Sequence, residues 1–293
     1  MCDVANRTTS PEARCARSRA SLIHLSLSRY VQAGAGLLGY PRAGACRSGR
    51  QVLFHLAHGL QSALLCCQAQ PIRLVLAYAG VDYEDKLYSV TAGPDGCELS
   101  SAELTTPCLP LNRRRRSWES DWSGVKHSLG LDFPNLPYYI DGELKLTQSH
   151  AILQHVAEKA GLAGSTPAAR ARSLMLLELS RDVRTPYVNF CYSGSLAGKD
   201  ALLAALAPTL GALETYIATT PGPFLMEEFT YVDLVWADLL EQILVLSPSA
   251  SFATLPRLTA FQAHVAALPA IAAYRASGQC IDRPFNNKMA VFK

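Results

Sequence analysis

Trp122 and Lys126 place an indole N–H and an ammonium group four residues apart. Both groups donate hydrogen bonds and neither accepts one, so the pair suits a carboxylate ligand. Taken alone, each residue has a commoner explanation: a tryptophan usually packs in a core, and an isolated lysine usually carries a solvated charge. The anion-binding interpretation therefore depends on the elements that surround the pair.

A second position for an anion is predicted where a hairpin meets a helix. Residues 136–146 alternate apolar and polar side chains around Asp141-Gly142, a dipeptide typical of a type I′ turn. Ser149 is predicted to cap the helix that follows. Because N–H groups and the helix dipole favour negative charge at such a start, Gln148 and Ser149 are candidates to bind a carboxylate. A plain capping role for Ser149 is compatible with this one.

These positions fall in an α/β segment that is followed by an all-helical one. Residues 70–160 are predicted to form a helix, a strand, a hairpin and a helix, with a foreign-looking insertion over residues 91–117. Residues 161–293 show helical patterns only. Residues 1–69 are rich in Arg, Ser and Cys and hold no sustained period of 2 or 3.6, so we predict a disordered extension there.

Local signals predict where several elements begin and end. Pro71 is expected in the first turn of a helix that ends at Gly80, and residues 81–90 are expected to form a strand. The helical half carries the start signals Thr166-Pro167, Leu255-Pro256 and Leu268-Pro269, a leucine stripe from Leu202 to Ile217, and a capping box over Thr230–Asp233.

The composition excludes several classes of protein. The chain has 293 residues, 49% of them hydrophobic and 17% charged, which is enough for a core and too apolar for general disorder. The longest apolar run, residues 52–67, is shorter than a membrane span and holds two histidines. Residues 1–70 carry eight arginines and two acids, which leaves 19 basic and 22 acidic side chains in residues 71–293. We therefore expect neither a nucleic-acid nor a membrane partner.

The nine cysteines predict free thiols rather than a disulfide framework or a metal site. Seven of them precede residue 110, and Cys191 and Cys280 stand far apart without a CxxC pattern. Free thiols are typical of a reducing compartment, so we expect a cytoplasmic protein without a bound metal.

Several motifs together resemble the cytosolic glutathione transferases, and the mu class in particular, over residues 70–90 and 118–293. The motifs are Trp122-x-x-x-Lys126, the run Leu129–Tyr138, Gln148-Ser149-x-Ala151-Ile152-Leu153, Phe229–Asp233 and Lys288–Val291. The resemblance implies an α/β thioredoxin-like N-terminal domain, with its first strand missing or replaced, followed by an all-α C-terminal helical domain. It also implies a homodimer that uses glutathione as co-substrate and needs no other cofactor.

The resemblance assigns a role to each matching residue. Trp122 and Lys126 would bind the glycyl carboxylate of glutathione, and Gln148 and Ser149 would bind its γ-glutamyl carboxylate. Leu136, ahead of a cis Pro137, would pair its backbone with the cysteinyl unit, and Asn135 would also bind glutathione. The partner subunit's Asp182 would reach the γ-glutamyl ammonium, Tyr192 would line the electrophile pocket, and Phe133 would lock the dimer. The alternatives are a solvated Asp182, a core Tyr192, and a Phe133 buried in its own chain.

The catalytic tyrosine of the family is not found at its usual place. That tyrosine stands in a Tyr-Trp-x-x-Arg-Gly run just before the first helix, and its phenol stabilises the glutathione thiolate. No tyrosine stands in residues 52–70, and the nearest upstream one is Tyr40, about thirty residues before the helix, which we name as the candidate. Glu119 stands where the family has an arginine, and Arg116 could substitute for it.

We therefore expect an enzyme that conjugates the glutathione thiolate to hydrophobic electrophiles in detoxification. The alternative is a non-catalytic protein of the glutathione transferase fold that binds ligands or serves a structural role. The missing tyrosine favours the alternative, whereas the ligand-binding motifs that remain favour the enzyme.

Overall fold

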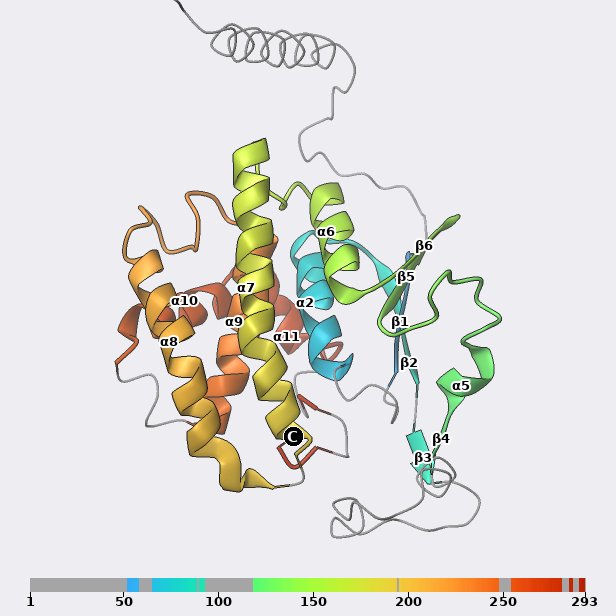
Figure 1. The fold of residues 1–293 in the computed structure, drawn as a ribbon. Helices are drawn as coiled ribbons and strands as arrows, with labels where there is room; N and C mark the ends of the chain where they lie inside the picture. The colour runs from blue at the N-terminus through green and yellow to red at the C-terminus, as the bar shows by residue number, and fades with distance from the viewer. Residues whose placement is uncertain are drawn as a thin grey trace, which may run out of the picture. The chain divides into compact units, whose positions relative to one another are not determined.

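In the computed structural model of the protein, the N-terminal domain is built on a four-stranded sheet (Figure 1). Strand β1 (Val52–Ala57) pairs in parallel with β2 (Tyr83–Tyr88) and antiparallel with β5 (Tyr138–Asp141), which pairs antiparallel with β6 (Leu144–Thr147). The strand order is β2-β1-β5-β6, so β1 is a central strand. The structure describes residues 52–57, 65–88, 90–92, 118–193, 195–247, 254–280, 285–286 and 290–292.

We expected the first strand of the thioredoxin-like domain to be either missing or replaced. The structure has a strand at this position, which supports the expectation that it is replaced. Residues 52–57, Val-Leu-Phe-His-Leu-Ala, form this strand. The segment that we bounded at residue 69 therefore contributes a strand and the start of the next helix to the sheet domain. Tyr40 and Arg116 lie outside the described residues.

Helix α2 (Leu65–Tyr78) begins earlier than predicted, so Pro71 lies inside it rather than in its first turn. The helix ends as expected at Gly80, which has a φ of 64° and donates its N–H to the carbonyl of Ala77. Arg73 on α2 forms an ion pair with Asp85 on β2, with 2.7 Å between Nε and Oδ2. This buried guanidinium fixes the helix against the sheet.

The insertion over residues 91–117 is closed by a short ladder. Strand β2 is shorter than the predicted strand over 81–90, and a separate strand β3 (Val90–Ala92) pairs antiparallel with β4 (Trp118–Ser120). A short helix, α5 (Asp121–Val125), follows β4 directly and was not predicted.

The predicted hairpin is present, but its turn is not of the predicted type. Asp141 pairs with Leu144, so the two loop residues are Gly142 and Glu143. Gly142 has a φ of 64° and Glu143 does not have a positive φ. A type I′ turn needs positive φ at both loop positions, whereas glycine at the first position alone is the pattern of a type II′ turn. The prediction failed because Asp141 is the last strand residue rather than a turn residue.

The remaining helices confirm the predicted starts. Thr166 accepts a hydrogen bond from the N–H of Ala169 at 3.0 Å, and Thr230 and Asp233 form the capping box. The helices are α6 (Ser149–Lys159), α7 (Pro167–Cys191), the 3₁₀ turn η1 (Leu196–Gly198), α8 (Lys199–Ile217), α9 (Tyr231–Leu246), α10 (Pro256–Ala266) and α11 (Pro269–Ala276).

One hydrophobic core joins the sheet helices to the helical half. Helices α2 and α6 lie between the sheet and the bundle formed by α7 to α11 (Figure 1), and their apolar faces share a core with α7 and α9. Trp236 of α9 is fully buried there and donates its indole N–H to the carbonyl of Leu176 at 3.0 Å. Arg184 and Asp238 form a buried ion pair between α7 and α9 at 3.1 Å.

The stretch from Leu196 to Ile217 is long and apolar enough to cross a membrane by length and composition alone. Core helices of soluble proteins pass the same test. Its leucine stripe is buried against the helical core, as the sequence predicts, with Leu202, Leu206, Leu210, Leu213 and Ile217 in contact with that core.

Candidate functional site

The strand pairing brings the predicted binding segments to one edge of the sheet. His55 near the end of β1 is in register with Tyr138 at the start of β5, and Tyr138 is in register with Thr147 at the end of β6. Pro137 directly precedes Tyr138, and Ser149 follows Thr147 by two residues. The Leu136–Pro137 peptide and the start of α6 therefore lie at the same edge.

The Leu136–Pro137 peptide bond is cis, which confirms the prediction. Leu136 is buried, and its N–H donates to the side-chain Oδ1 of Asn135 at 2.9 Å. Asn135 itself is exposed. The resemblance assigns the backbone N–H of Leu136 to glutathione, but in this structure that N–H already donates to the side chain of Asn135. A ligand that pairs with Leu136 must therefore displace the Asn135 side chain.

Trp122 belongs to a small aromatic core under the edge of the sheet. Its ring stacks on Tyr138 with 5.6 Å between centroids, and it meets Tyr88 edge-on at 5.5 Å. The hydroxyls of Tyr88 and Tyr138 lie 2.8 Å apart. Burial, followed by the hydrogen bond with Tyr88, raises the pKa of Tyr138 far above its ordinary value. Trp122 is half-buried. It packs against this core, as tryptophan side chains commonly do, and part of it is exposed at the surface.

Lys126 is joined to Trp122 through one helical turn, because its N–H donates to the carbonyl of Trp122 at 2.9 Å. Its side chain is half-buried. Among the described residues, no carboxylate forms an ion pair with its ammonium group. The two predicted donors therefore share one turn, and the cation is available to a carboxylate ligand.

The start of α6 differs from the prediction by one residue. Gln148, rather than Ser149, is the N-cap, with φ 71° and ψ 110°, and its side chain makes no capping hydrogen bond. Ser149 is the first helical residue and is buried. Because the chain turns into the helix at Gln148, Ser149 already has a helical conformation and is not the N-cap. Positive φ is costly for a non-glycine residue and is commonest at functional sites.

Asp182 and Tyr192 lie on or next to α7, apart from the sheet edge. Asp182 is exposed, whereas Tyr192 caps the C-terminus of α7 and packs against the main core. Pro186 lies inside α7 without ending it. Asp182 is exposed to solvent in the single chain, which is compatible both with a solvated surface residue and with a role across a dimer. Tyr192 is half-buried, which is compatible both with a core residue and with a residue that lines a pocket.

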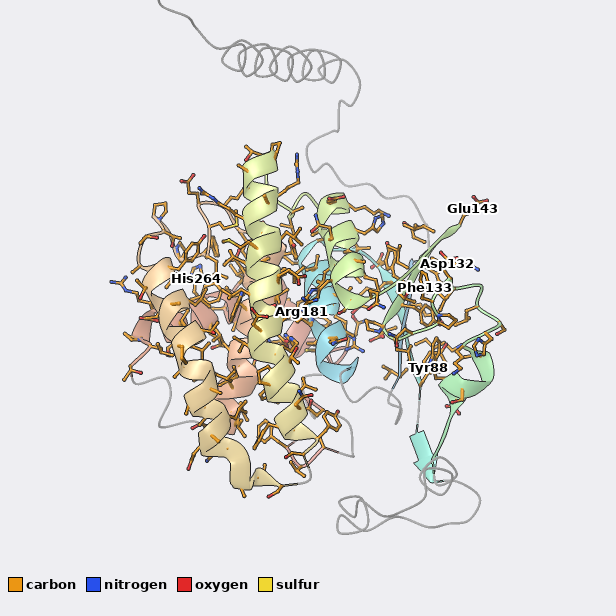
Figure 2. All side chains as sticks on the ribbon, in the orientation of Figure 1. Tyr88, Asp132, Phe133, Glu143, Arg181 and His264 are labelled. Carbon is orange, nitrogen blue, oxygen red and sulfur yellow. The ribbon has the colours of Figure 1, made fainter. Side chains whose placement is uncertain are left out.

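Phe133 is exposed on the loop before β5, with 75% of its surface accessible (Figure 2). The alternative to a dimer role, burial of Phe133 in its own chain, is therefore wrong. Leu174 and Met175 on α7 are also exposed, at 46% and 55%. Large apolar side chains mark an interaction surface where they form a contiguous patch.

The sequence analysis did not predict a group of polar and charged residues at the start of α6. His150 of α6 contacts Glu178 of α7, and Glu178 also pairs with Arg181. His150 and Glu178 are 28 residues apart, so no local spacing signals their contact. Among the described residues no group of His, Cys, Asp and Glu side chains has the arrangement of a metal site.

The catalytic group remains the unmatched part of the site. The resemblance puts a tyrosine at the end of the first strand, and residues 52–57 contain no tyrosine, serine or cysteine. The candidate Tyr40 lies outside the described residues.

Comparison with solved structures defines the fold. The chain superposes on a pi-class glutathione S-transferase of Onchocerca volvulus with a TM-score of 0.62 and 20% identity, covering 82% of this chain and 99% of that one. It superposes on NaGST-2 with a TM-score of 0.58 and 21% identity, covering 78% and 97%. The fold is thus a thioredoxin-like domain followed by a helical domain, as the sequence predicts.

Sequence comparison defines the family. Residues 181–278 match the family model described as "Glutathione S-transferase, C-terminal domain". Glutathione S-transferase Mu 2 of Macaca fuscata fuscata is 35% identical over 225 residues, which cover 76% of this chain and 93% of that protein. A class-mu 26 kDa isozyme of Fasciola hepatica is 33% identical over 228 residues, with 76% and 90% covered. The chain belongs to the glutathione S-transferase family, within its mu class, and is a transferase that uses glutathione.

The backbone of Gln148 gives a test of strain at the site. Glycine adopts positive φ without a steric cost, so we expect Gln148→Gly to leave the free energy of unfolding unchanged or to raise it by about 1 kcal/mol. Equilibrium unfolding in urea measures this. Ala151→Gly, on the exposed side of the same helix, is the control and should lower stability by about 1 kcal/mol. Equal losses in both variants would contradict the strain.

Proposed function

We propose that glutathione binds along the edge of the sheet between Lys126 and the start of α6. The proposal is carried by one observation: the pairing of β1, β5 and β6 puts the cis Leu136–Pro137 peptide and the start of α6 at a single edge. Glutathione is an extended tripeptide with a carboxylate at each end. A cation one turn from Trp122, whose ring stacks on Tyr138 at this edge, and the N–H groups at the start of α6 supply partners for those two charges.

Each residue has a defined part in this proposal. Lys126 and the indole N–H of Trp122 bind the glycyl carboxylate. Leu136 pairs its backbone with the cysteinyl unit after Asn135 releases it. Gln148 and Ser149 bind the γ-glutamyl carboxylate at the start of α6. The glutathione thiol gives up its proton to solvent, its sulfur forms a bond to an electrophilic carbon, and the leaving group departs with the bonding electrons. The site contributes by holding the sulfur in position.

We further propose that the protein works as a homodimer in the cytoplasm and detoxifies hydrophobic electrophiles. Phe133, Leu174 and Met175 support the dimer because they are apolar and exposed in the single chain. A second subunit would also supply Asp182 to the γ-glutamyl ammonium, and its exposure on α7 is compatible with that role. Tyr192 would line the pocket for the electrophile.

The composition of β1 is the observation behind the second candidate function, a glutathione-binding member of this family without turnover. No residue of that strand can donate a hydrogen bond from a side-chain hydroxyl to the sulfur, since 52–57 reads Val-Leu-Phe-His-Leu-Ala. The two functions differ in turnover rather than in binding.

Removing the Lys126 cation tests the binding site. We expect Lys126→Ala to raise the dissociation constant of glutathione about tenfold or more, because a charge-assisted contact contributes about 1.5–3 kcal/mol. Isothermal titration calorimetry measures the constant. Lys199→Ala, at the start of α8, is the matched control and should bind like the unaltered protein. Unchanged affinity in Lys126→Ala would refute the assignment.

The pH dependence of conjugation tests the mechanism. A free thiol has a pKa of about 8.5, so without a hydroxyl donor to the sulfur we expect kcat/KM to keep rising from pH 6.5 to pH 8.5. The assay uses an aryl halide such as chlorodinitrobenzene and subtracts the uncatalysed rate. A plateau below pH 7.5 would reveal a thiolate-stabilising donor, and Tyr40→Phe would then identify it. A rate equal to the uncatalysed one, in a protein that binds glutathione in the calorimeter, would support the second candidate function.

Replacing Phe133 tests the dimer. Burial of a phenylalanine contributes about 1.5–3 kcal/mol, and a two-fold interface contains the contact twice. We therefore expect Phe133→Ser to raise the dimer dissociation constant by about a hundredfold or more, measured by sedimentation equilibrium. Leu144→Ser, another exposed apolar position on β6, should leave it unchanged. A dimer that survives Phe133→Ser with unaltered affinity contradicts the proposed interface.

A further inference from the structure

A network of three polar side chains joins the start of α6 to the middle of α7. The Nδ1 atom of His150 lies 3.0 Å from Oε1 of Glu178, and Oε2 of the same carboxylate lies 2.9 Å from Nη2 of Arg181. Each carboxylate oxygen thus serves one partner. The network joins the last helix of the sheet domain to the first helix of the helical domain, and Figure 2 labels Arg181 about halfway along α7.

One end of this network adjoins the proposed γ-glutamyl site of the same chain. His150 is the second residue of α6 and directly follows Ser149. Arg181, at the other end, directly precedes Asp182, which in the proposed dimer serves the site of the second subunit. The N-cap Gln148 makes no side-chain capping bond, so the first turn of α6 receives its side-chain support from His150 and Glu178 rather than from a cap.

The charge state of His150 fits a neutral hydrogen-bond donor. Burial lowers the pKa of His150, and Arg184 and Arg181 lower it further, while the hydrogen bond and charge of Glu178 act in the opposite direction. All three charged groups that act on the imidazole belong to α7. A neutral imidazole whose Nδ1 faces a carboxylate carries its hydrogen on Nδ1, so His150 donates and Glu178 accepts.

We propose that His150 is a positioning residue for glutathione, which acts through Glu178 to hold the first turn of α6 where it receives the γ-glutamyl carboxylate. Arg181 pairs with the second oxygen of Glu178 and so favours the orientation that turns the first oxygen toward His150. The inference rests on the proposed function, because it assumes that Ser149 binds the γ-glutamyl end. It goes beyond that function in naming the residues that set the orientation of this part of the site.

The decisive measurement compares the binding of two ligands. One is glutathione, and the other is N-acetylcysteinylglycine, which lacks the γ-glutamyl carboxylate and ammonium but keeps the thiol and the glycyl carboxylate. We expect His150→Ala to raise the dissociation constant of glutathione about fivefold to tenfold and to leave that of N-acetylcysteinylglycine within about twofold. His150→Asn, whose amide N–H can replace Nδ1–H, should restore most of the affinity for glutathione.

Glu178→Ala provides an independent route to the same result, because its half-exposed side chain can be removed without opening the core. We expect the same loss as in His150→Ala, and no additional loss in the double variant, since both changes break one contact. An equal loss for both ligands would overturn the proposal, because it would reveal a general structural role. An unchanged affinity for glutathione in both single variants would also overturn it.

Lys126→Ala separates failure of this inference from failure of the proposed function. If Lys126→Ala weakens glutathione binding while the His150 and Glu178 variants do not, the proposed binding site stands and the positioning role is wrong. If the unaltered protein binds neither ligand, the proposed function itself is wrong and the positioning role falls with it.

Discussion

The pairing of β1 with β2 on one side and β5 on the other is the interaction on which the proposed site depends. It joins β2 to the β5–β6 hairpin and thereby places the cis Leu136–Pro137 peptide, the start of α6 and the aromatic core around Trp122 along one edge. The hydrogen bonds of a β ladder come from the backbone and do not depend on side-chain identity. A strand without the tyrosine that the resemblance implies can therefore keep the framework of this family. The fold of this domain therefore does not depend on a tyrosine in its first strand.

Helix α7 is held by partners that leave it little freedom, which matters because it carries Glu178, Asp182 and, at its end, Tyr192. Its buried Arg184 pairs with Asp238, and the carbonyl of Leu176 accepts the indole N–H of Trp236. A buried charge is tolerated only when it is paired, so the Arg184–Asp238 contact constrains the relative placement of α7 and α9. The proposed electrophile site and the proposed dimer contacts thus share one firmly placed helix.

Features with local signals were predictable from the sequence. Thr166, Thr230, Pro256 and Pro269 mark helix starts through caps and fixed φ angles, and the structure confirms all four. These signals depend on neighbours within one helical turn, so they survive any tertiary arrangement.

Features that depend on distant partners were not predictable in the same way. Residues 52–57 form a strand because β2 and β5 lie on either side of them, and nothing within the run specifies those partners. Ser149 lost its predicted cap position to Gln148, whose positive φ no sequence rule predicts for glutamine. The contact of His150 with Glu178 depends on how α6 and α7 pack, so it emerged only from the structure.

The backbone contact between the end of α7 and residues 290–292 has a consequence for the order of folding. The N–H of Val291 donates to the carbonyl of Cys191 at 2.8 Å, and Phe292 packs edge-on against Tyr187. About a hundred residues of chain separate the two partners. On a ribosome, which makes the protein from its N-terminus, α7 is complete long before Val291 emerges. The carbonyl at the end of α7 can therefore receive the N–H of Val291 only after residues 290–292 have left the ribosome, so this contact is among the last to form.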